Sequence, residues 1–261
     1  MTNGVKIENQ GAIMVVTLDR PKANAIDAQT SRDLGAAFVE FRDDDSLLCA
    51  IITGGGDRIF SAGWDLKAAA DGEDESADFG PGGFAGVTEL WDLYKPVIAA
   101  VNGVAVGGGV ELALACDIIV AVEGATFSLP ETGVGVAADA GGLQRLPRKI
   151  PYNIAVEMLL TGRRMDMTEA KNYGLVNHVV PRDELMPKAQ ELADSIVRGA
   201  PLSIKAIKEI LRGIDGVNTR EAFQRINQRE FPIHRQMLTS EDHDEGPQAF
   251  AEKRAPMWKG K

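Results

Sequence analysis

Three consecutive glycines and one acidic residue are the first candidates for chemistry, in the stretch VNGVAVGGGVELALACD, residues 101–117. The apolar run before Gly107 is strand-like, and the run after Gly109, which carries Glu111, is helical in character. Glycine inside a structured element costs stability relative to alanine, so we expect these glycines to allow a close backbone approach. A helix that begins there offers free N–H groups and the positive end of its dipole. An acyl oxygen over the N–H of Gly108 would therefore be stabilised.

A good oxyanion site needs a second backbone donor, and the stretch FSAGWDLK, residues 60–67, is the candidate for it. Its turn of small residues, Ala62-Gly63, could present the N–H of Trp64 to the same oxygen. Removing one such donor typically costs about 3 kcal/mol of transition-state stabilisation. The two motifs together predict chemistry on an acyl group whose carbonyl oxygen becomes negatively charged.

A second acidic residue follows a proline in FSLPETGVG, residues 127–135. Pro130 keeps the preceding backbone extended, so we expect Glu131 to project from a loop rather than to lie along a helix. Two carboxyl groups near an activated acyl group can act on one water and one carbon, as acid and base. For Glu111 or Glu131 alone, the alternative is an ordinary surface charge.

Several familiar motifs can be excluded. The stretches TGGGDRIFSAG and GVAVGGGVELA superficially look like phosphate-binding loops, but neither fits the G-x-x-x-x-G-K-[ST] or G-x-G-x-x-G patterns. No serine lies in a G-x-S-x-G nucleophile elbow. A nucleotide-binding Rossmann domain remains an alternative on fold class alone.

The elements that must position these residues alternate between strand and helix. Short apolar runs predict buried strands at residues 11–19, 47–56, 95–103, 116–124 and 125–131. The stretch 29–44 predicts an amphipathic helix that buries Leu34, Phe38 and Phe41. This order predicts an α/β fold. From about residue 185 the pattern is entirely helical, with a break between helices at Gly199-Ala200-Pro201.

Composition limits the classes of function. The chain has 261 residues, 44% of them hydrophobic, which suffices for one sizeable core, and its net charge of −10 argues against nucleic acid or an anionic membrane as partner. No apolar stretch reaches the length of a membrane span, and the N-terminus lacks the apolar core of a signal peptide. We therefore expect a cytoplasmic protein.

The cysteines and histidines predict neither a disulfide nor a metal site. Cys49 and Cys116 stand alone in apolar runs, so we expect buried, reduced thiols. The three histidines, His178, His234 and His243, have no ligand-like spacing with the cysteines.

One internal segment has a different composition. Residues 68–86, AAADGEDESADFGPGGFAG, combine acidic residues, glycines and a proline and predict a long mobile loop. The loop is either a solvated insertion or a lid beside a site, because long loops in compact domains are often functional.

Five stretches in one order resemble a known family. RPKANAID, FSAGWDLK, VNGVAVGGGVELALACD, PETGVGVAADAGGLQRLPR and TGRRMDMTEA resemble motifs of the crotonase, or enoyl-CoA hydratase/isomerase, superfamily. The resemblance extends from about Val5 to the C-terminal stretch EGPQAFAEKRAPMWKG. It implies a spiral of ββα units over residues 1–195 and a helical oligomerisation region over residues 196–261, which assembles a homotrimer or a dimer of trimers.

The resemblance also assigns roles to residues. It places the two oxyanion-hole N–H groups on Trp64 and Gly108, and the two acid–base glutamates of the family's hydratases on Glu111 and Glu131. Because both glutamates are present, it favours reversible hydration of a 2,3-unsaturated acyl-CoA thioester over the family's other reactions. It implies no metal and no cofactor, since coenzyme A is part of the substrate. A generic enoyl-CoA hydratase and a non-catalytic acyl-CoA-binding protein remain alternatives.

Binding of coenzyme A is implied for several further residues. The resemblance places Lys22, Ala23 and Ala25 along the CoA path, with Lys22 either at a phosphate or in solvent. It implies that the carbonyl of Ala62 binds the adenine amino group. It also implies binding roles for Asp65 and Leu66, in the same motif, and for Pro130, beside the second glutamate. Phe250 and Lys253 would complete the nucleotide pocket of a neighbouring subunit; alternatively, Phe250 packs and Lys253 is solvated.

The acyl group is the least constrained part of the prediction. Most hydratases of the family have a small residue where this chain has Trp64. An acyl chain ending in a quaternary ammonium could be held by the aromatic faces of Trp64, Trp91 or Tyr94, unless Trp91 and Tyr94 pack beneath the loop. The family's usual Pro-Gly is replaced by Ala138 and Asp139. Asp139 would face the ammonium or a hydroxyl of the acyl chain, or else cap the following helix.

Overall fold

The computed structural model describes residues 4–74 and 76–261. The chain divides into two compact units. The first comprises Met1–Leu93 and Val97–Ala193, and the second comprises Tyr94–Pro96 and Asp194–Lys261. The chain passes from the first unit to the second after Ala193, inside helix α7 (Leu185–Val197). The domain boundary predicted from the sequence, between residues 195 and 196, falls in the same helix.

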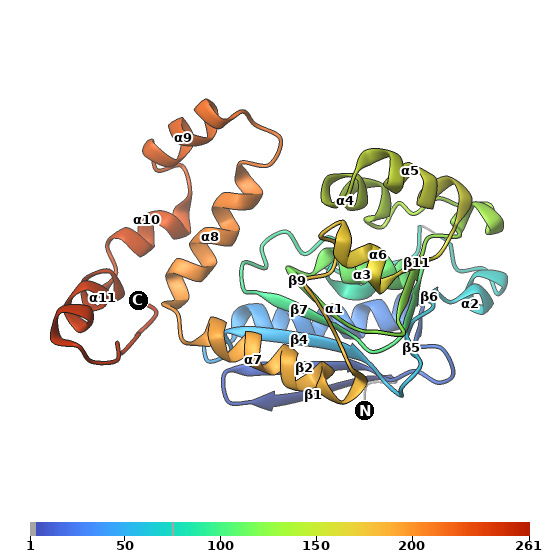
Figure 1. Cartoon of the computed structure of the whole chain (residues 1–261), viewed down its shortest axis with the longest axis horizontal. Coiled ribbons are helices and arrows are strands. Elements are labelled where there is room, and N and C mark those ends of the chain that lie inside the picture. Colours follow the sequence, from blue (N-terminus) through green and yellow to red (C-terminus); the bar gives the residue numbers. More distant parts are fainter. Residues whose placement is uncertain (1–3, 75) are drawn as a thin grey trace. The chain divides into compact units, whose positions relative to one another are not determined.

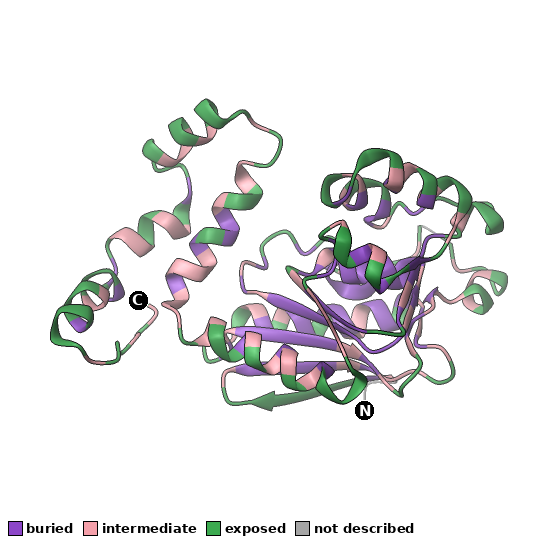
Figure 2. Cartoon of the chain, in the orientation of Figure 1, coloured by how far each residue is buried: buried purple, intermediate pink, exposed green. Residues whose placement is uncertain are grey.

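A six-stranded sheet forms the centre of the first unit (Figure 1). Its strands lie in the order β1 (Val5–Gln10), β2 (Ile13–Leu18), β4 (Cys49–Gly54), β7 (Val97–Val101), β9 (Ile118–Val122) and β12 (His178–Val180). Only the β1–β2 pair is antiparallel. The inner strands are almost entirely buried, whereas β1 is exposed (Figure 2). This agrees with their continuous apolar sequences, which are typical of parallel strands covered on both faces.

Two smaller sheets bring the predicted motifs together. One has the order β11 (Met165–Asp166), β10 (Thr126–Ser128), β8 (Val104–Val106) and β5 (Ile59–Ser61), and the other pairs β3 (Ala25–Ile26) with β6 (Gly63–Trp64). Strands β5, β8 and β10 are parallel neighbours. Their carboxyl ends therefore lie at one edge, where the segments that carry Trp64, Gly108 and Glu131 leave the sheet.

The helices of the first unit cover these sheets. Helix α1 (Ala28–Asp43) buries Leu34, Phe38 and Phe41 completely, as predicted. The others are α2 (Leu66–Ala70), α3 (Gly108–Ala115), α4 (Gly142–Lys149), α5 (Tyr152–Thr161) and α6 (Met167–Asn172), with 3₁₀ turns η1 (Phe84–Gly86), η2 (Glu131–Val134) and η3 (Arg182–Glu184). Cys49 and Cys116 are buried thiols, also as predicted.

The second unit is helical, as its sequence pattern predicts. After α7 it contains α8 (Pro201–Gly213), α9 (Thr219–Asn227), α10 (Pro232–Leu238) and α11 (Glu241–Glu252). The stretch 218–238, predicted as helical throughout, is divided into α9 and α10. Pro232 explains the division, because it lacks an N–H and favours the first position of a new helix.

Across residues 4–74 and 76–261, no helix combines the length and apolarity that crossing a bilayer requires. Within the same residues, no cluster of three or more His, Cys, Asp or Glu side chains could hold a metal ion.

Candidate active site

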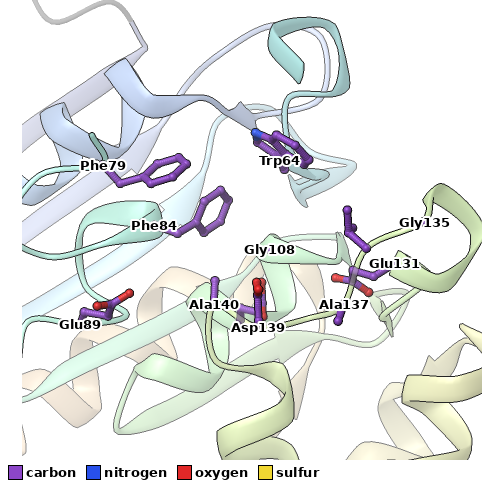
Figure 3. A pocket seen from close by; sticks show the side chains of 12 residues that line it. Trp64, Phe79, Phe84, Glu89, Gly108, Glu131, Gly135, Ala137, Asp139 and Ala140 are labelled. Carbon is purple, nitrogen blue, oxygen red and sulfur yellow. The ribbon is translucent and has the colours of Figure 1, made fainter. Parts of the chain in front are cut away.

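A cavity of about 520 Å³ lies at the edge where β8 and β10 end (Figure 3). Its wall combines aromatic side chains, carboxylates and short backbone segments that come from three distant parts of the first unit. The lining residues are Trp64, Phe79, Phe84, Glu89, Gly108, Glu111, Glu131, Gly135, Val136, Ala137, Asp139 and Ala140. The structure thus places four predicted site residues, together with Asp139, around a single cavity.

The two predicted backbone donors lie on segments that are in direct contact. A Cβ atom built on Gly63 would lie 2.5 Å from the amide nitrogen of Gly108 and 2.6 Å from the carbonyl oxygen of Val106. Gly63 also has a φ of +77°, which favours glycine. No other residue type fits this contact, and it brings the segments that carry Trp64 and Gly108 together at the cavity wall.

Gly107 explains how α3 begins beside the second acid. Its φ of +54° is in the left-handed region, and its N–H donates to the carbonyl oxygen of Ser128 at 2.8 Å. A Cβ atom here would lie 2.9 Å from Oε1 of Glu131. The first glycine of the run therefore turns the chain from β8 into α3 and leaves room for the Glu131 carboxyl group.

Glu111 lies in the first turn of α3 and is only 4% exposed. Its Oε1 accepts a hydrogen bond from the N–H of Gly142 at 2.9 Å. Burial raises the pKa of Glu111 to about 7, and the negative charges of Glu131 and Asp139 add to the rise while the Gly142 hydrogen bond opposes it. A carboxyl group with such a pKa can both accept and release a proton near neutral pH.

Glu131 is the first residue of the 3₁₀ turn η2. The prediction that it projects from a loop rather than a helix is therefore wrong, because it lies in one short helical turn. Its Oε2 is buried and has no hydrogen-bond partner among the described residues. Burial raises the pKa of Glu131, and the charge of Asp139 raises it further. The unpartnered oxygen belongs to a side chain that lines the cavity.

Asp139 is exposed on the cavity wall. The alternative that it caps the following helix is wrong, because α4 begins at Gly142 with Gly141 as its N-cap and no side chain caps it. Asp139 instead adds a third carboxylate to those of Glu111 and Glu131 and opposes the ionisation of both.

The aromatic residues of the cavity differ from those predicted. Trp64 lines it, but Trp91 is 66% exposed beneath the guanidinium of Arg145, and it does not line the cavity. Tyr94 belongs to the second unit, where the guanidinium of Arg212 lies over its ring. Phe79 and Phe84, which we did not predict, line the cavity in their place, with ring centroids 5.9 Å apart.

The acidic loop at residues 68–86 is part of the cavity and not a solvated insertion. It contributes Phe79 and Phe84, and Phe84 and Ala85 are buried. Glu73 connects it to its surroundings: one carboxylate oxygen accepts from the indole N–H of Trp64 at 3.0 Å, and the other accepts from the N–H of Ala28 at 2.9 Å. Sequence analysis also missed Glu73, because an acid in a run of acids has no distinguishing signal.

The residues predicted to bind coenzyme A do not line this cavity. The Ala62 N–H donates to the carbonyl of Ala23 at 2.9 Å, so the two predicted CoA motifs are adjacent. Lys22 and Leu66 are exposed at these motifs, Ala25 is half-buried, and Pro130 lies just before η2.

Asp65, Phe250 and Lys253 also lie outside the cavity wall. Asp65 forms an ion pair with Arg20 at 2.9 Å and caps α2 through the N–H of Lys67. Phe250 is 87% exposed, so the alternative that it packs within the chain is wrong. Lys253, the C-cap residue of α11, is exposed, and both residues belong to the second unit.

The fold and the cavity define an α/β protein in which two glutamates of raised pKa lie beside a tight approach of two backbone segments. The chain belongs to the enoyl-CoA hydratase/isomerase family, whose sequence model matches residues 8–261. It is 56% identical to proteins named carnitinyl-CoA dehydratase from Salmonella typhi and from Citrobacter koseri, over 261 residues that cover 100% of this chain and of each relative.

Solved structures with similar folds agree with this assignment. The crystal structure of enoyl-CoA hydratase from Mycobacterium tuberculosis H37Rv superimposes with a TM-score of 0.90 at 41% identity and covers 99% of both chains. That of enoyl-CoA hydratase from Bacillus anthracis gives a TM-score of 0.88 at 34% identity, over 99% of this chain and 100% of the other. These comparisons confirm the family and the fold class that the motifs predicted.

Proposed function

We propose that this protein is a hydro-lyase that adds water to, and removes it from, a 2,3-unsaturated acyl-CoA thioester. The physiological pair in this proposal is crotonobetainyl-CoA and carnitinyl-CoA. The observation that carries the reaction class is the cavity in which Glu111 and Glu131, both with raised pKa values, lie beside the Gly63–Gly108 approach. The full-length relatives named carnitinyl-CoA dehydratase support the choice of acyl group.

The thioester carbonyl oxygen binds between the N–H groups of Trp64 and Gly108. As water adds to the β-carbon, negative charge moves through the α-carbon to this oxygen, and the two donors stabilise the resulting enolate. Such donors act in a partly enclosed site without having to reorient, which is why each contributes strongly. The dipole of α3, whose first residue is Gly108, adds to this stabilisation.

Glu111 and Glu131 divide the proton transfers. Ionised Glu111 accepts a proton from the attacking water, whose oxygen bonds to the β-carbon. Protonated Glu131 donates its proton to the α-carbon, which completes the addition of one water molecule. In dehydration each carboxyl group has the reverse role. The pKa of Glu111, raised to about 7, makes both of its protonation states accessible near neutral pH, and burial also raises the pKa of Glu131.

The reaction needs no metal and no cofactor in this proposal, since coenzyme A enters as part of the substrate. Lys22, Ala23, Ala25 and Ala62 line its path, next to Asp65, Leu66 and Pro130. The exposed position of Lys22 is compatible with a phosphate contact.

A direct test compares hydration of crotonobetainyl-CoA and crotonyl-CoA by the wild type and by the Glu111→Gln and Glu131→Gln variants. Each variant should lose about 100-fold or more in kcat, because acid–base catalysis supplies factors of that size. The matched control Glu123→Gln, an exposed glutamate outside the cavity, should retain wild-type turnover.

The outcomes of this assay separate the alternatives. Near-normal turnover in either cavity variant would refute the assigned roles. Equal activity on both thioesters would favour a generic enoyl-CoA hydratase. Binding of both thioesters without any turnover would indicate a non-catalytic member of the family.

The chain also assembles, in this proposal, as a homotrimer or a dimer of trimers through its C-terminal helical region. Five large apolar side chains of that region are exposed in the single chain and support an interface there: Ile207, Leu211, Phe223, Phe250 and Met257. Phe250 and Lys253 would then reach the nucleotide pocket of a neighbouring subunit.

A further inference from the structure

We propose that Trp64, Phe79, Phe84 and Glu89 form a subsite for a cationic acyl terminus, a quaternary ammonium group. This inference rests on the proposed function and specifies how that function selects its substrate. It replaces the sequence-based expectation that Trp91 and Tyr94 would take part, since neither lines the cavity.

Phe79 and Phe84 form one aromatic wall of the cavity. Phe79 and Phe84 pack edge to face, with ring centroids 5.9 Å apart and an interplanar angle of 63°. The Phe84 ring also covers Gly108, so closely that a Cβ atom on that glycine would collide with it. The wall therefore begins at one of the proposed oxyanion donors and extends away from it toward Phe79 (Figure 3).

The indole of Trp64 is held in place by the loop. Its N–H donates to Glu73, whose other carboxylate oxygen accepts from the first residue of α1. A fixed ring loses little conformational freedom when a ligand binds, so its contact with a cation contributes more fully to affinity. Indole faces are also the best aromatic partners for cations.

The charge of the cavity favours a cationic ligand. Its wall carries Glu89, Glu111, Glu131 and Asp139, and no lysine, arginine or histidine from the described part of the chain. Glu89 lies at the Phe79–Phe84 end in Figure 3, whereas Glu131 lies at the opposite end. A Cβ atom on Gly83 would lie 2.9 Å from the Glu89 carboxyl group, which places this carboxylate against the same turn that carries Phe84.

Glu89 is thus an exposed carboxylate on the same cavity wall as Phe79 and Phe84, and no salt bridge compensates it within residues 4–74 and 76–261. Quaternary ammonium groups cannot donate hydrogen bonds, so aromatic faces with one nearby carboxylate suit them. Glu111 and Glu131 have proton-transfer roles in the proposed reaction, and Asp139 acts on the ionisation of both. Of the four cavity carboxylates, Glu89 at the Phe79–Phe84 end is therefore the one assigned as counter-ion of the cation.

The test isolates the charge of the acyl terminus from its shape. Two substrates are compared: crotonobetainyl-CoA, and the isosteric thioester in which carbon replaces the ammonium nitrogen and leaves a tert-butyl group. The measured quantity is the ratio of their kcat/KM values for hydration. In the wild type, this ratio should favour the cationic substrate by about tenfold or more, since one cation–π contact alone supplies about that factor.

Two variants then test the residues. Glu89→Gln keeps the shape and removes the charge, and Phe79→Leu removes one aromatic face while keeping an apolar side chain. Each should lower the ratio by about five- to tenfold. Glu40→Gln, an exposed glutamate on α1 outside the cavity, is the matched control and should leave the ratio unchanged.

The result separates this inference from the function on which it rests. If the wild type hydrates neither thioester, the proposed function itself fails. If it hydrates both but the ratio is near one, or if Glu89→Gln leaves the ratio at the wild-type value, the subsite is refuted while the hydratase activity stands.

Discussion

Glu111 shows how one residue's environment decides its chemistry. A carboxyl group at the start of a helix would ordinarily ionise readily, because the helix dipole and free N–H groups favour its charged form. Here burial has the larger effect and raises the pKa of Glu111 to about 7. Asp139 and Glu131 strengthen this effect through like-charge repulsion, while Gly142 limits it with a hydrogen bond.

Replacing Asp139 with asparagine should shift the pH dependence of hydration. Glu111 must be ionised to accept a proton from water, so kcat/KM should fall as the pH decreases through its pKa. The Asp139 carboxylate opposes that ionisation, so Asp139→Asn should lower the pKa of Glu111 and move the acidic limb of the profile to lower pH. The limb should stay above pH 4.5, the ordinary value, because burial, the largest cause, is unchanged.

The pH profile of kcat/KM over the acidic range checks this expectation. Asp183→Asn, an exposed aspartate of η3 outside the cavity, serves as the control and should reproduce the wild-type limb. An unmoved limb in Asp139→Asn, or a limb moved to higher pH, would contradict the role given to Asp139.

Part of this residue-level arrangement could be predicted from the sequence. Trp64, Gly108, Glu111 and Glu131 stand in short motifs whose glycines and proline have local meanings, and all four line the cavity. Phe79, Phe84 and Glu89 could not be found in this way. They follow a run of acids and glycines without helical or strand periodicity, and only the folded loop brings them to the cavity wall.

At the scale of elements, apolar runs identified the inner strands of the large sheet. The helical sequence pattern from about residue 185 identified the C-terminal helical region. Strands of two residues, such as β3 and β6, escaped because they are too short to show a period. Short strands nevertheless bring the motifs together, since pairing of β5 with β8 and of β8 with β10 fixes which segments leave the sheet at the same edge.

We expect Glu73 to stabilise the loop at residues 68–86 by hydrogen bonds to the rest of the first unit. The variant Glu73→Ala removes acceptors for the indole N–H of Trp64 and for the first N–H of α1. Hydrogen bonds to a charged group contribute about 1.5–3 kcal/mol each, and α1 can replace part of the loss with water. We expect the free energy of unfolding to fall by about 1–3 kcal/mol.

Chemical denaturation measures this loss, and limited proteolysis locates it. Glu73→Ala should be cleaved faster within residues 68–86 than the wild type. The control Asp71→Ala removes an exposed carboxylate from the same loop and should change neither measurement. Wild-type stability and cleavage in Glu73→Ala would show that Phe84 and the other contacts of the loop hold it without Glu73.

At the scale of the whole molecule, the first unit has a buried sheet at its centre, whereas the helices of the second are largely exposed (Figure 2). Large apolar side chains are exposed in both units, and in the second they are Ile207, Leu211, Phe223, Phe250 and Met257. Contiguous exposed apolar surface on a soluble protein marks an interaction site. The net charge of −10 did not predict these exposed apolar side chains, because it is a property of the whole chain and says nothing about position.

Disruption of this surface should change the oligomeric state. Phe223 is exposed on α9, and Phe223→Glu would place a charge inside the proposed contact between subunits, where burying an unpaired carboxylate is costly. We expect the wild type to show three or six times the mass of one chain by light scattering coupled to size-exclusion chromatography, and Phe223→Glu to shift toward the single-chain mass. Arg220→Glu, a charge reversal at an exposed position of the same helix, should retain the assembly. A wild type that elutes as a single chain would contradict the proposed trimer, and a Phe223→Glu variant that keeps the wild-type mass would exclude α9 from the interface.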